Sequence, residues 1–463
     1  MIRLFQVFVP VGTLTLLVSE ALLVSSALLL ATFLALEVDP SVFLLYDGGL
    51  PRIAVVLVSI LTGLYLSDLY SQYFVKSRIL LLQQLCLVMG AAFLFQAFIS
   101  YLNPNFRVPI RVMVTGSAFA IAAIYIWRLL FSAFAIQVVG RDRLLLVGGS
   151  PLLEDIARHV EQRPEIGLAV VGYVDDAHEI GTMLPGGKAL GPLAAFREIV
   201  TAVKPNRIVV GMYERRNRVP VPELLELRFA GHIIEEAATA YERVCGRVCL
   251  KELRPAQLIY SGELGPHPQD VAHQRILDSA LAAMGLLVFW PFMLLTALAV
   301  RLSSPGPVLY RQTRVGLNGR EFTLYKFRSM RADAEAGTGA VWASKHDPRV
   351  TVVGQLIRRI RFDELPQLLN VIRGEMAIVG PRPERPEFVR ELSEQIAYYR
   401  QRHCVRPGIT GWAQINHKYG DTLEDTISKL EYDLYYIKNM SLGLDTYIIL
   451  QTLKTMLLSR GAQ

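Results

Sequence analysis

The chain has 463 residues, of which 52% are hydrophobic and only 19% are charged, and its net charge is +7. The length allows two or three domains, and a charged share below the usual quarter indicates a membrane protein. The basic balance suits an anionic membrane surface or a phosphorylated substrate. Nucleic acid is not an expected partner, because no block of Lys and Arg interleaved with aromatic residues stands out.

The first 140 residues contain four apolar runs, and each is about long enough to cross a hydrocarbon core as a helix. The runs lie near positions 11–36, 51–70, 79–102 and 108–138. Positive charge gathers at the N-terminus, between the second and third runs, and after the fourth. The N-terminus and everything after residue 140 are therefore predicted to face the cytoplasm. Residues 1–140 are expected to form a four-helix transmembrane bundle, with Glu20 as a candidate intramembrane acid and Asp68 as either a second one or an interface residue.

From residue 143 the pattern changes to alternating strands and helices. Apolar strand-like runs such as RLLLVGG and NRIVVGM are separated by helical stretches such as LLEDIARHV. Such alternation is typical of a parallel sheet, and we predict an α/β Rossmann-like middle domain over 141–265. Gly148 and Gly149 open the run GGSPLLED, which lacks the later glycines of a dinucleotide fingerprint, so NAD is not expected. A regulatory nucleotide or a dimer contact stays open for this domain.

A fifth apolar run, residues 276–300, is also long enough to cross the bilayer. Pro291 lies in its middle, where it removes a helix hydrogen bond and kinks the axis. Arg275 and Arg301 flank the run, and basic residues at both ends favour both ends on one membrane face. We therefore predict a re-entrant helix over 275–301. The alternative is an ordinary fifth span, which would place the last third of the chain outside the cell.

Two adjacent acids, Asp363 and Glu364, stand in the segment RFDELPQLLNVIRGEMAIVGPRP. Neighbouring residues on a helix lie about 100° apart, so the two carboxylates make a poor proton-sharing pair. They suit two separate tasks at a helix start, one toward a substrate and one toward a metal, and Pro366 fits an early helical turn. For this segment alone, a plain N-terminal capping motif is the alternative.

Arginine-bearing segments lie on both sides of the acids in the sequence. YKFRSM offers Lys326 and Arg328, GPRPERPEF offers Arg382 and Arg385, and RPGITGWAQIN offers Arg406 beside glycines. Arginine suits bidentate contacts with phosphate, and Mg²⁺ is commonly held by one or two carboxylates together with substrate phosphates. Two acids with several such arginines describe a diphosphate site, which works by positioning and charge neutralisation.

The segments KFRSM, DELPQLLNVIRGEMAIVGPRP and RPGITGWAQIN, in this order, resemble the bacterial sugar transferase family. The resemblance covers residues 270–463 and implies a mainly α, monotopic polyprenyl-phosphate glycosyl-1-phosphate transferase domain with a re-entrant membrane helix. The apolar runs and the Rossmann-like domain resemble the long form, which initiates exopolysaccharide or O-antigen synthesis. The N-terminal MIRLFQVFVPVGTLTLLVSEALL resembles the PEP-CTERM/exosortase-associated subgroup. Many members carry Ser-Pro at the helix break, where this chain has Trp290-Pro291.

The resemblance also implies a chemistry. Asp363 would attack the β-phosphate of a UDP-sugar, form a covalent phospho-sugar enzyme and release UMP. Undecaprenyl phosphate would then take the sugar phosphate, in a ping-pong order. Glu364 would bind Mg²⁺, with Asp363 as a second ligand, or would help to deprotonate the acceptor. The implied phosphate-binding residues are Lys326, Arg328, Arg382, Arg385 and Arg406. The implied location is the bacterial inner membrane with cytoplasmic globular domains, and a homodimer is expected.

Several features leave alternatives open. Residues 446–458, TYIILQTLKTMLL, predict either an interfacial helix near the lipid substrate or a core helix. The four cysteines form no C-x-x-C pair, which favours structural thiols over a zinc site. A membrane-tethered nucleotide-sugar epimerase or dehydratase is a rival enzyme class, but it would need the missing glycine fingerprint. A membrane scaffold is the rival class without catalysis. The transferred sugar is not decided, and glucose or galactose is the family-level expectation.

Overall fold

The structure is a computed structural model, and it describes most of the chain. The described ranges are 2–4, 7–9, 11–37, 39–70, 77–138, 142–211, 220–250, 268–331, 349–417 and 422–457. The chain divides into two units, each with its own buried hydrophobic clusters. The first unit comprises Met1–Arg3 and Phe8–Ala237, and the second comprises Leu4–Val7 and Ala238–Gln463.

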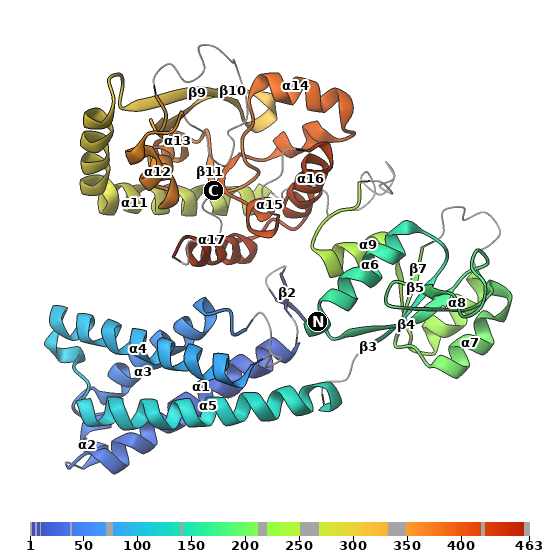
Figure 1. Cartoon of the computed structure of the whole chain (residues 1–463), viewed down its shortest axis with the longest axis horizontal. Helices are drawn as coiled ribbons and strands as arrows, with labels where there is room; N and C mark the ends of the chain where they lie inside the picture. The colour runs from blue at the N-terminus through green and yellow to red at the C-terminus, as the bar shows by residue number, and fades with distance from the viewer. Residues whose placement is uncertain are drawn as a thin grey trace. The chain divides into compact units, whose positions relative to one another are not determined.

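Four long helices form at the four apolar runs, as predicted. They are α1 (Val11–Ala35), α3 (Gly49–Leu66), α4 (Arg78–Leu102) and α5 (Ile110–Val138), and the short α2 (Pro40–Leu45) precedes α3. By length and composition each long helix can cross a membrane, and their transmembrane arrangement stays a prediction. One hydrophobic cluster joins them, and α1 runs alongside α5 (Figure 1). Gly116 permits this close approach, because a Cβ there would lie 2.8 Å from the Leu28 side chain.

The predicted intramembrane acid Glu20 has a buried partner. Arg128 of α5 pairs with Glu20 of α1 at 2.7 Å, and both side chains are almost fully buried. The Arg128 Nη1 also donates to the carbonyl of Leu69 at 2.7 Å. Asp68 follows the end of α3 with a φ of 62°, a left-handed conformation that is typical of a helix terminus. Asp68 thus lies at the end of its helix and not in its middle.

The predicted α/β region forms a six-stranded sheet in the order β5-β6-β4-β3-β7-β8. The strands are β3 (Asp142–Val147), β4 (Leu168–Val174), β5 (Met183–Leu184), β6 (Gly187–Gly191), β7 (Arg207–Val210) and β8 (Ile233–Glu236). All neighbours pair in parallel except β5 with β6. Helices α7 (Phe196–Val203) and α8 (Val221–Phe229) cover one face, and α6 (Pro151–Gln162) lies on the other (Figure 1). The expected mixture of strands and helices is therefore confirmed.

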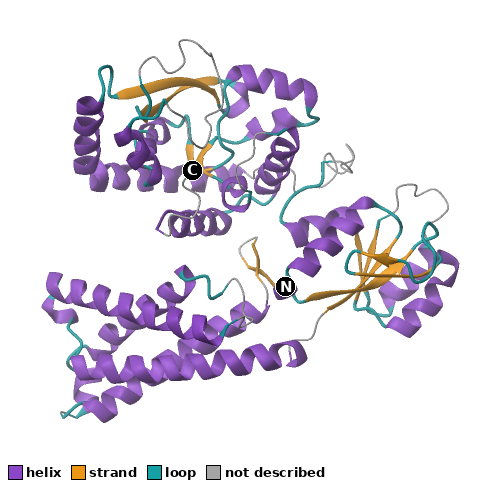
Figure 2. Ribbon diagram, in the orientation of Figure 1, coloured by secondary structure: helices purple, strands orange, loops and turns teal. Residues whose placement is uncertain are grey.

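In the described part of the second unit, helix predominates around two small sheets (Figure 2). Strands β9 (Leu309–Val315) and β10 (Glu321–Phe327) are antiparallel, whereas β11 (Ala377–Val379) and β12 (Gly408–Thr410) are parallel. The helices are α9 (Ala237–Cys245, whose first residue belongs to the first unit), α11 (Pro268–Ser303), α12 (Val352–Arg359), α13 (Gln367–Arg373), α14 (Pro386–Gln395), α15 (Trp412–Asn416), α16 (Leu423–Lys438) and α17 (Leu442–Leu457).

The fifth apolar run forms part of α11, a single helix with Pro291 inside it. Figure 1 shows α11 changing direction along its length, as a proline in a helix interior predicts. The half before the bend buries Gln274, Asp278 and Ala282 against the rest of the unit. Around and after the bend the helix exposes large apolar side chains, among them Leu287, Trp290, Leu294 and Leu298. These surfaces fit membrane contact, and the predicted return to the same membrane face stays a prediction.

Both predicted domain boundaries, near residues 140 and 265, lie at or within segments outside the described residues. Residues 246–250, which the predicted middle domain includes, make contacts within the second unit. The Trp412 indole donates to the Gly246 carbonyl at 2.7 Å, and the Val248 amide donates to the Glu431 carbonyl at 3.1 Å. Among the described residues, β8 is the last strand of the α/β sheet in chain order.

Helix α17 combines the two alternatives drawn for the C-terminal run. Leu444 and Ile448 are buried in the main cluster of the second unit. Leu442, Leu450 and Leu453 are exposed on the same helix. One face thus packs as a core helix does, and another offers the apolar surface of an interfacial helix.

Candidate active site

The two acids lie in a short 3₁₀ turn, Phe362–Glu364, that joins α12 to α13. Arg361 precedes the turn with a φ of 57°, a left-handed conformation that costs about 1–2 kcal/mol for a residue other than glycine. Pro366 occupies the N-cap position of α13, close to the predicted early helical turn, and makes no side-chain capping hydrogen bond. Both carboxyl-bearing residues are buried, with 9% exposure for Asp363 and 8% for Glu364. Strained backbone and buried acids together are typical of functional sites.

The bend of α11 packs directly on this turn. The Phe362 ring meets the rings of Phe289 and Phe292 with centroid distances of 6.4 and 6.2 Å, both edge to face. These two phenylalanines flank Pro291, so the turn beside Asp363 rests on the bent part of the helix. The bend therefore helps to fix where the acids stand within the second unit.

Three cations surround the Glu364 carboxylate. Lys326 Nζ from β10 lies 3.3 Å from Oε1, and Arg382 Nη2 from the turn after β11 donates to the same oxygen at 3.0 Å. Arg361 Nη1 lies 3.5 Å from Oε2. Although burial opposes ionisation, these cations outweigh it and hold the pKa of Glu364 well below its usual range. Glu364 is therefore a fixed anion that holds cations from separate segments together.

Asp363 has a different environment from its neighbour. Within the part of the chain that the structure describes, no hydrogen bond or ion pair holds its carboxylate. Burial, and then the charge of Glu364, raise its pKa to about 6, while Lys326 opposes this rise. Burial also lowers the pKa of Lys326. Environments that separate the pKa values of two neighbouring acids assign them different roles.

The structure brings two of the five predicted phosphate-binding residues, Lys326 and Arg382, to the acids. Arg328 is buried at the end of α11, where it donates to the carbonyls of Ser304 and Pro305 at 2.7 and 2.9 Å. These hydrogen bonds of Arg328 stabilise the loop that follows α11.

The other two predicted arginines lie elsewhere in the second unit. Arg406 Nε donates to the Gly374 carbonyl at 3.2 Å, at the end of α13 opposite the acids. Arg385 is the N-cap residue of α14. It lies near Arg314, where burial lowers the pKa of that guanidinium and the charge of Arg385 adds to the effect. The phosphate contacts of Arg328, Arg385 and Arg406 stay predictions.

Other arginines join the site without having been predicted for it. Arg361 contacts Glu364, and Arg358 acts electrostatically on Asp363 while its Nε donates to Ser329 Oγ at 2.8 Å. The basic run at 358–361, immediately before the acids, is the sequence signal that could have predicted Arg358 and Arg361. Arg314 and Arg402 bind the turn that carries Arg382, and no local pattern marks them.

Asp363 and Glu364 are the candidate ligands for a Mg²⁺ ion at this site. No group of three or more His, Cys, Asp or Glu side chains capable of holding a metal occurs in the described ranges. Mg²⁺ needs only one or two carboxylates when substrate phosphates complete its shell. Among the described residues, Glu364 Oε2 has only the 3.5 Å contact with Arg361, and Asp363 adjoins Glu364 in the sequence. The two acids therefore fit an ion that arrives with a diphosphate, and they do not make a closed metal site by themselves.

The site as a whole carries a surplus of positive charge. Lys326, Arg361 and Arg382 face one fixed anion, Glu364, and Arg314 lies close behind them. Asp363 is mostly ionised at pH 7, but the three cations still outnumber the two carboxylates, and such a surplus attracts an anion. A substrate with two linked phosphates matches this demand, whereas a neutral substrate does not.

Comparison with known proteins gives the chain its family. Residues 269–459 match the family described as bacterial sugar transferase. A UDP-glucose:undecaprenyl-phosphate glucose-1-phosphate transferase of Xanthomonas campestris pv. campestris is 33% identical over 73% of this chain and 71% of that protein. A UDP-N-acetylgalactosamine-undecaprenyl-phosphate N-acetylgalactosaminephosphotransferase of Aeromonas hydrophila is 46% identical over 48% of this chain and 52% of that protein, so the match spans about half of it.

Further relatives match over a smaller share of the chain. A UDP-glucose:undecaprenyl-phosphate glucose-1-phosphate transferase of Escherichia coli (strain K12) is 46% identical over 39% of this chain and 39% of that protein. An exopolysaccharide production protein of Rhizobium leguminosarum bv. phaseoli is 42% identical over 40% of this chain and 94% of that protein. With the Xanthomonas relative matched over more than two thirds of its length, the chain belongs to the bacterial sugar transferase family.

Proposed function

We propose that this chain transfers a sugar 1-phosphate from a UDP-sugar to undecaprenyl phosphate and releases UMP, as the first membrane step of exopolysaccharide or O-antigen-type glycan synthesis. One observation carries the proposal: Asp363, with a pKa raised to about 6, adjoins an acid that already holds Lys326 and Arg382. One carboxylate is left to react while the other orders the cations. The names of the Xanthomonas and Escherichia relatives support the general reaction.

In the first step, a carboxylate oxygen of Asp363 attacks the phosphorus of the β-phosphate. A bond forms between this oxygen and phosphorus, the bond from phosphorus to the bridging oxygen breaks, and UMP leaves with the electron pair. With a pKa of about 6, most Asp363 carboxyls are ionised at pH 7 and need no separate base. The product is an aspartyl phospho-sugar intermediate.

The cations supply the charge neutralisation that this step requires. Lys326 and Arg382 both contact Glu364 Oε1, which keeps the two cations beside each other and next to Asp363. Glu364 would hold Mg²⁺ with a second oxygen from Asp363, and the ion would add neutralisation of the diphosphate when bound. Because its pKa is held so low, Glu364 is a poor base, so holding cations is the better role for it.

In the second step, a phosphate oxygen of undecaprenyl phosphate attacks the phosphorus of the intermediate. The bond between phosphorus and Asp363 breaks, the carboxylate is regenerated, and the sugar leaves on a polyprenyl diphosphate. The acceptor is a lipid, and the site lies beside an α11 bend that exposes Trp290 and other apolar side chains. The proposed location is the bacterial inner membrane with the globular parts in the cytoplasm, where UDP-sugars are made.

The test uses the full chain in lipid nanodiscs with labelled UDP-glucose, UDP-galactose and UDP-N-acetylgalactosamine, because the relatives named above differ in their sugar. Without acceptor we expect one UMP per enzyme and label on the protein. With undecaprenyl phosphate we expect the label in an organic-soluble product. Asp363→Asn should abolish both the labelling of the protein and the labelled organic-soluble product. If the label reaches the product only when both substrates are present, and never becomes bound to the protein, the ping-pong order is contradicted.

A further inference from the structure

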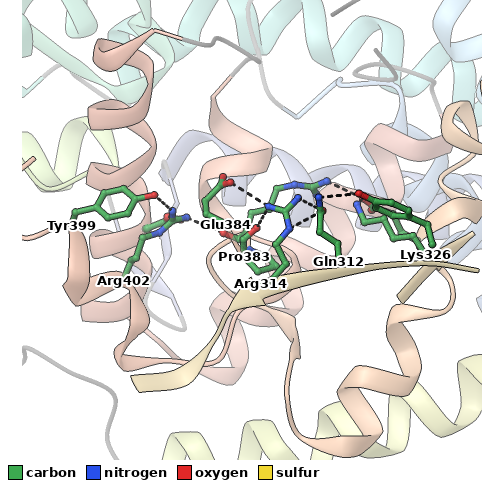
Figure 3. A network of polar contacts seen from close by, with 11 residues as sticks. Gln312, Arg314, Lys326, Pro383, Glu384, Tyr399 and Arg402 are labelled. Atoms are coloured by element: carbon green, nitrogen blue, oxygen red, sulfur yellow. Dashed lines mark hydrogen bonds and ion pairs between the residues drawn. The ribbon is translucent and has the colours of Figure 1, made fainter. Parts of the chain in front are cut away.

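The turn between β11 and α14 carries Arg382, and its position decides where that guanidinium stands. The turn reads Gly380-Pro381-Arg382-Pro383-Glu384. Its prolines have no N–H and cannot close the turn with hydrogen bonds of their own. Its place must therefore come from other elements. Figure 3 shows two arginines, Arg314 and Arg402, aimed at this turn from different parts of the second unit.

Arg402 reaches the turn from the 3₁₀ segment Tyr399–Cys404. Its Nη2 donates to the Arg382 carbonyl at 3.0 Å and to Asp433 Oδ2 of α16 at 2.8 Å. Its Nη1 donates to the Tyr399 hydroxyl at 2.7 Å. The Arg402 side chain is only 8% exposed, so the geometry of this contact is fixed by packing as well as by charge.

Arg314 reaches the next carbonyl from β9. Its Nη1 donates to the Pro383 carbonyl at 2.9 Å and lies 3.3 Å from Glu384 Oε2. Gln312 Oε1 accepts from Nε and Nη2 of Arg314 at 3.0 and 2.7 Å, which fixes the plane of the guanidinium. The adjacent Val315 amide donates to the Glu384 carbonyl at 2.9 Å. Strand β9 thus holds the end of the turn through both backbone and side chain.

Two guanidinium groups therefore bind consecutive carbonyls, those of Arg382 and Pro383, whereas the Arg382 side chain leaves the turn toward Glu364. We infer that Arg314 and Arg402 are positioning residues that fix this turn so that the Arg382 guanidinium meets the diphosphate of the substrate. The inference rests on the proposed function. It separates two roles for arginine in one site: Arg382 touches substrate, and Arg314 and Arg402 act only through Arg382 and its turn.

A double-mutant cycle tests this separation, because residues that act through a common group have non-additive effects. Arg314→Gln and Arg402→Gln are each measured alone and in an Arg382→Ala background, with the full chain in nanodiscs. Each alone should lower kcat/KM by about tenfold or more. In the Arg382→Ala background the same changes should cost less than about twofold. Equal losses in both backgrounds overturn the inference.

Arg247→Gln is the matched control. Arg247 lies 3.5 Å from Glu431 of α16, two residues from Asp433, and is half-buried like Arg314. Its described contacts are with Glu431 and the rings of Tyr241 and Tyr432, and not with the turn. Its effect should be small and the same in both backgrounds. If Arg402→Gln does not fold, the double-mutant cycle with Arg314→Gln tests the inference by itself. Arg314→Lys should recover less than half of the kcat/KM that Arg314→Gln loses, because lysine lacks the planar fork of arginine.

The outcomes also separate the inference from the proposed function. If Asp363→Asn abolishes transfer and the cycles are additive, the positioning role is wrong and the reaction stands. If Asp363→Asn keeps full transfer, the proposed covalent function is wrong. The inference then falls with it, since it assigns Arg382 to the substrate of that reaction.

Discussion

Two buried charge clusters in this chain differ in how their charges balance. In the first unit, Glu20 and Arg128 make one ion pair with 0% and 2% exposure. In the second unit, Glu364 faces Lys326, Arg361 and Arg382, whose side chains are 20–33% exposed. The first cluster is neutral and closed to solvent. The second has surplus positive charge and is partly open.

We propose that this difference separates a structural acid, Glu20, from a functional one, Glu364. A balanced, closed pair holds α1 to α5 and has no charge left for a ligand. A cluster with surplus cations gains when an anion binds, and its partial exposure gives that anion a route in. Burial in an apolar helix is the reason to consider Glu20 functional, whereas its balanced pair with Arg128 favours a structural role, and both stay predictions.

The largest effect is expected for substitution of Asp363, the acid of the second cluster whose carboxylate makes no described hydrogen bond or ion pair. Asp363→Asn should lower transfer by about 10³-fold or more, because an amide cannot replace a carboxylate nucleophile. The same change should raise the midpoint of thermal unfolding at pH 7. The folded-state pKa of about 6 lies above the ordinary value of 3.8, so ionisation disfavours the folded state progressively as pH rises from about 4 to 6, and the amide avoids this cost.

Transfer of a labelled UDP-sugar and the unfolding midpoint of the same preparation measure both effects. A variant that is inactive because it is less stable than the parent would contradict this account of Asp363. Its charge would then be part of the scaffold, as that of Glu20 is in the first unit.

Glu20→Gln should lower the free energy of unfolding and leave the transfer activity unchanged. It leaves Arg128 buried without its anion, for which the expected loss is about 3 kcal/mol or more of unfolding free energy. Chemical denaturation in detergent measures it, and transfer per folded molecule should stay near that of the parent. Adding Arg128→Met removes the unpaired charge and should recover most of the loss. A double variant as unstable as Glu20→Gln would mean that the pair is not the source of the effect.

The pH profile of transfer sharpens the comparison within the second cluster. Below pH 6 the Asp363 carboxyl takes up a proton, so kcat/KM should fall toward tenfold per pH unit, while Glu364 stays ionised. Above pH 6 the profile should level off, since a raised carboxyl pKa limits the rate only on the acid side. Steady-state rates from pH 5 to 8 measure it. A profile that stays flat down to pH 5 would place the reactive carboxyl in an unshifted environment.

Local patterns in the sequence predicted much of this molecule. The apolar runs predicted α1, α3, α4 and α5, and strand–helix alternation predicted the mainly parallel sheet, because both depend on side-chain periodicity within one segment. Lys326 and Arg382 were predicted beside the acids because each stands in a motif that resembles the family. The predicted end of the middle domain near residue 265 stays a prediction, because it lies outside the described residues. Residues 246–250 contact α15 and α16, which come much later in the chain, and no local pattern indicates such contacts.

What the sequence could not predict depends on contacts between distant segments. Arg402 binds a carbonyl 20 positions away and Arg314 one 69 positions away, and neither spacing has a local signature. Arg328 shows a different limit. It follows Lys326 by two residues, which would place both on one face of a strand, but β10 ends at Phe327 and Arg328 turns instead to the end of α11.

The smallest expected effect concerns Arg406, which the sequence predicts as a phosphate ligand and whose described contact is to the Gly374 carbonyl. A cation at a helix C-terminus stabilises its carbonyls by about 0.3–1 kcal/mol. If this is its role, Arg406→Gln should cost about that much stability and lower kcat/KM less than threefold, whereas Arg382→Ala should lower it at least tenfold. Parallel assays of the two variants measure the contrast. Comparable losses would mean that Arg406 reaches the phosphates after all, and that the cation surplus extends past the far end of α13.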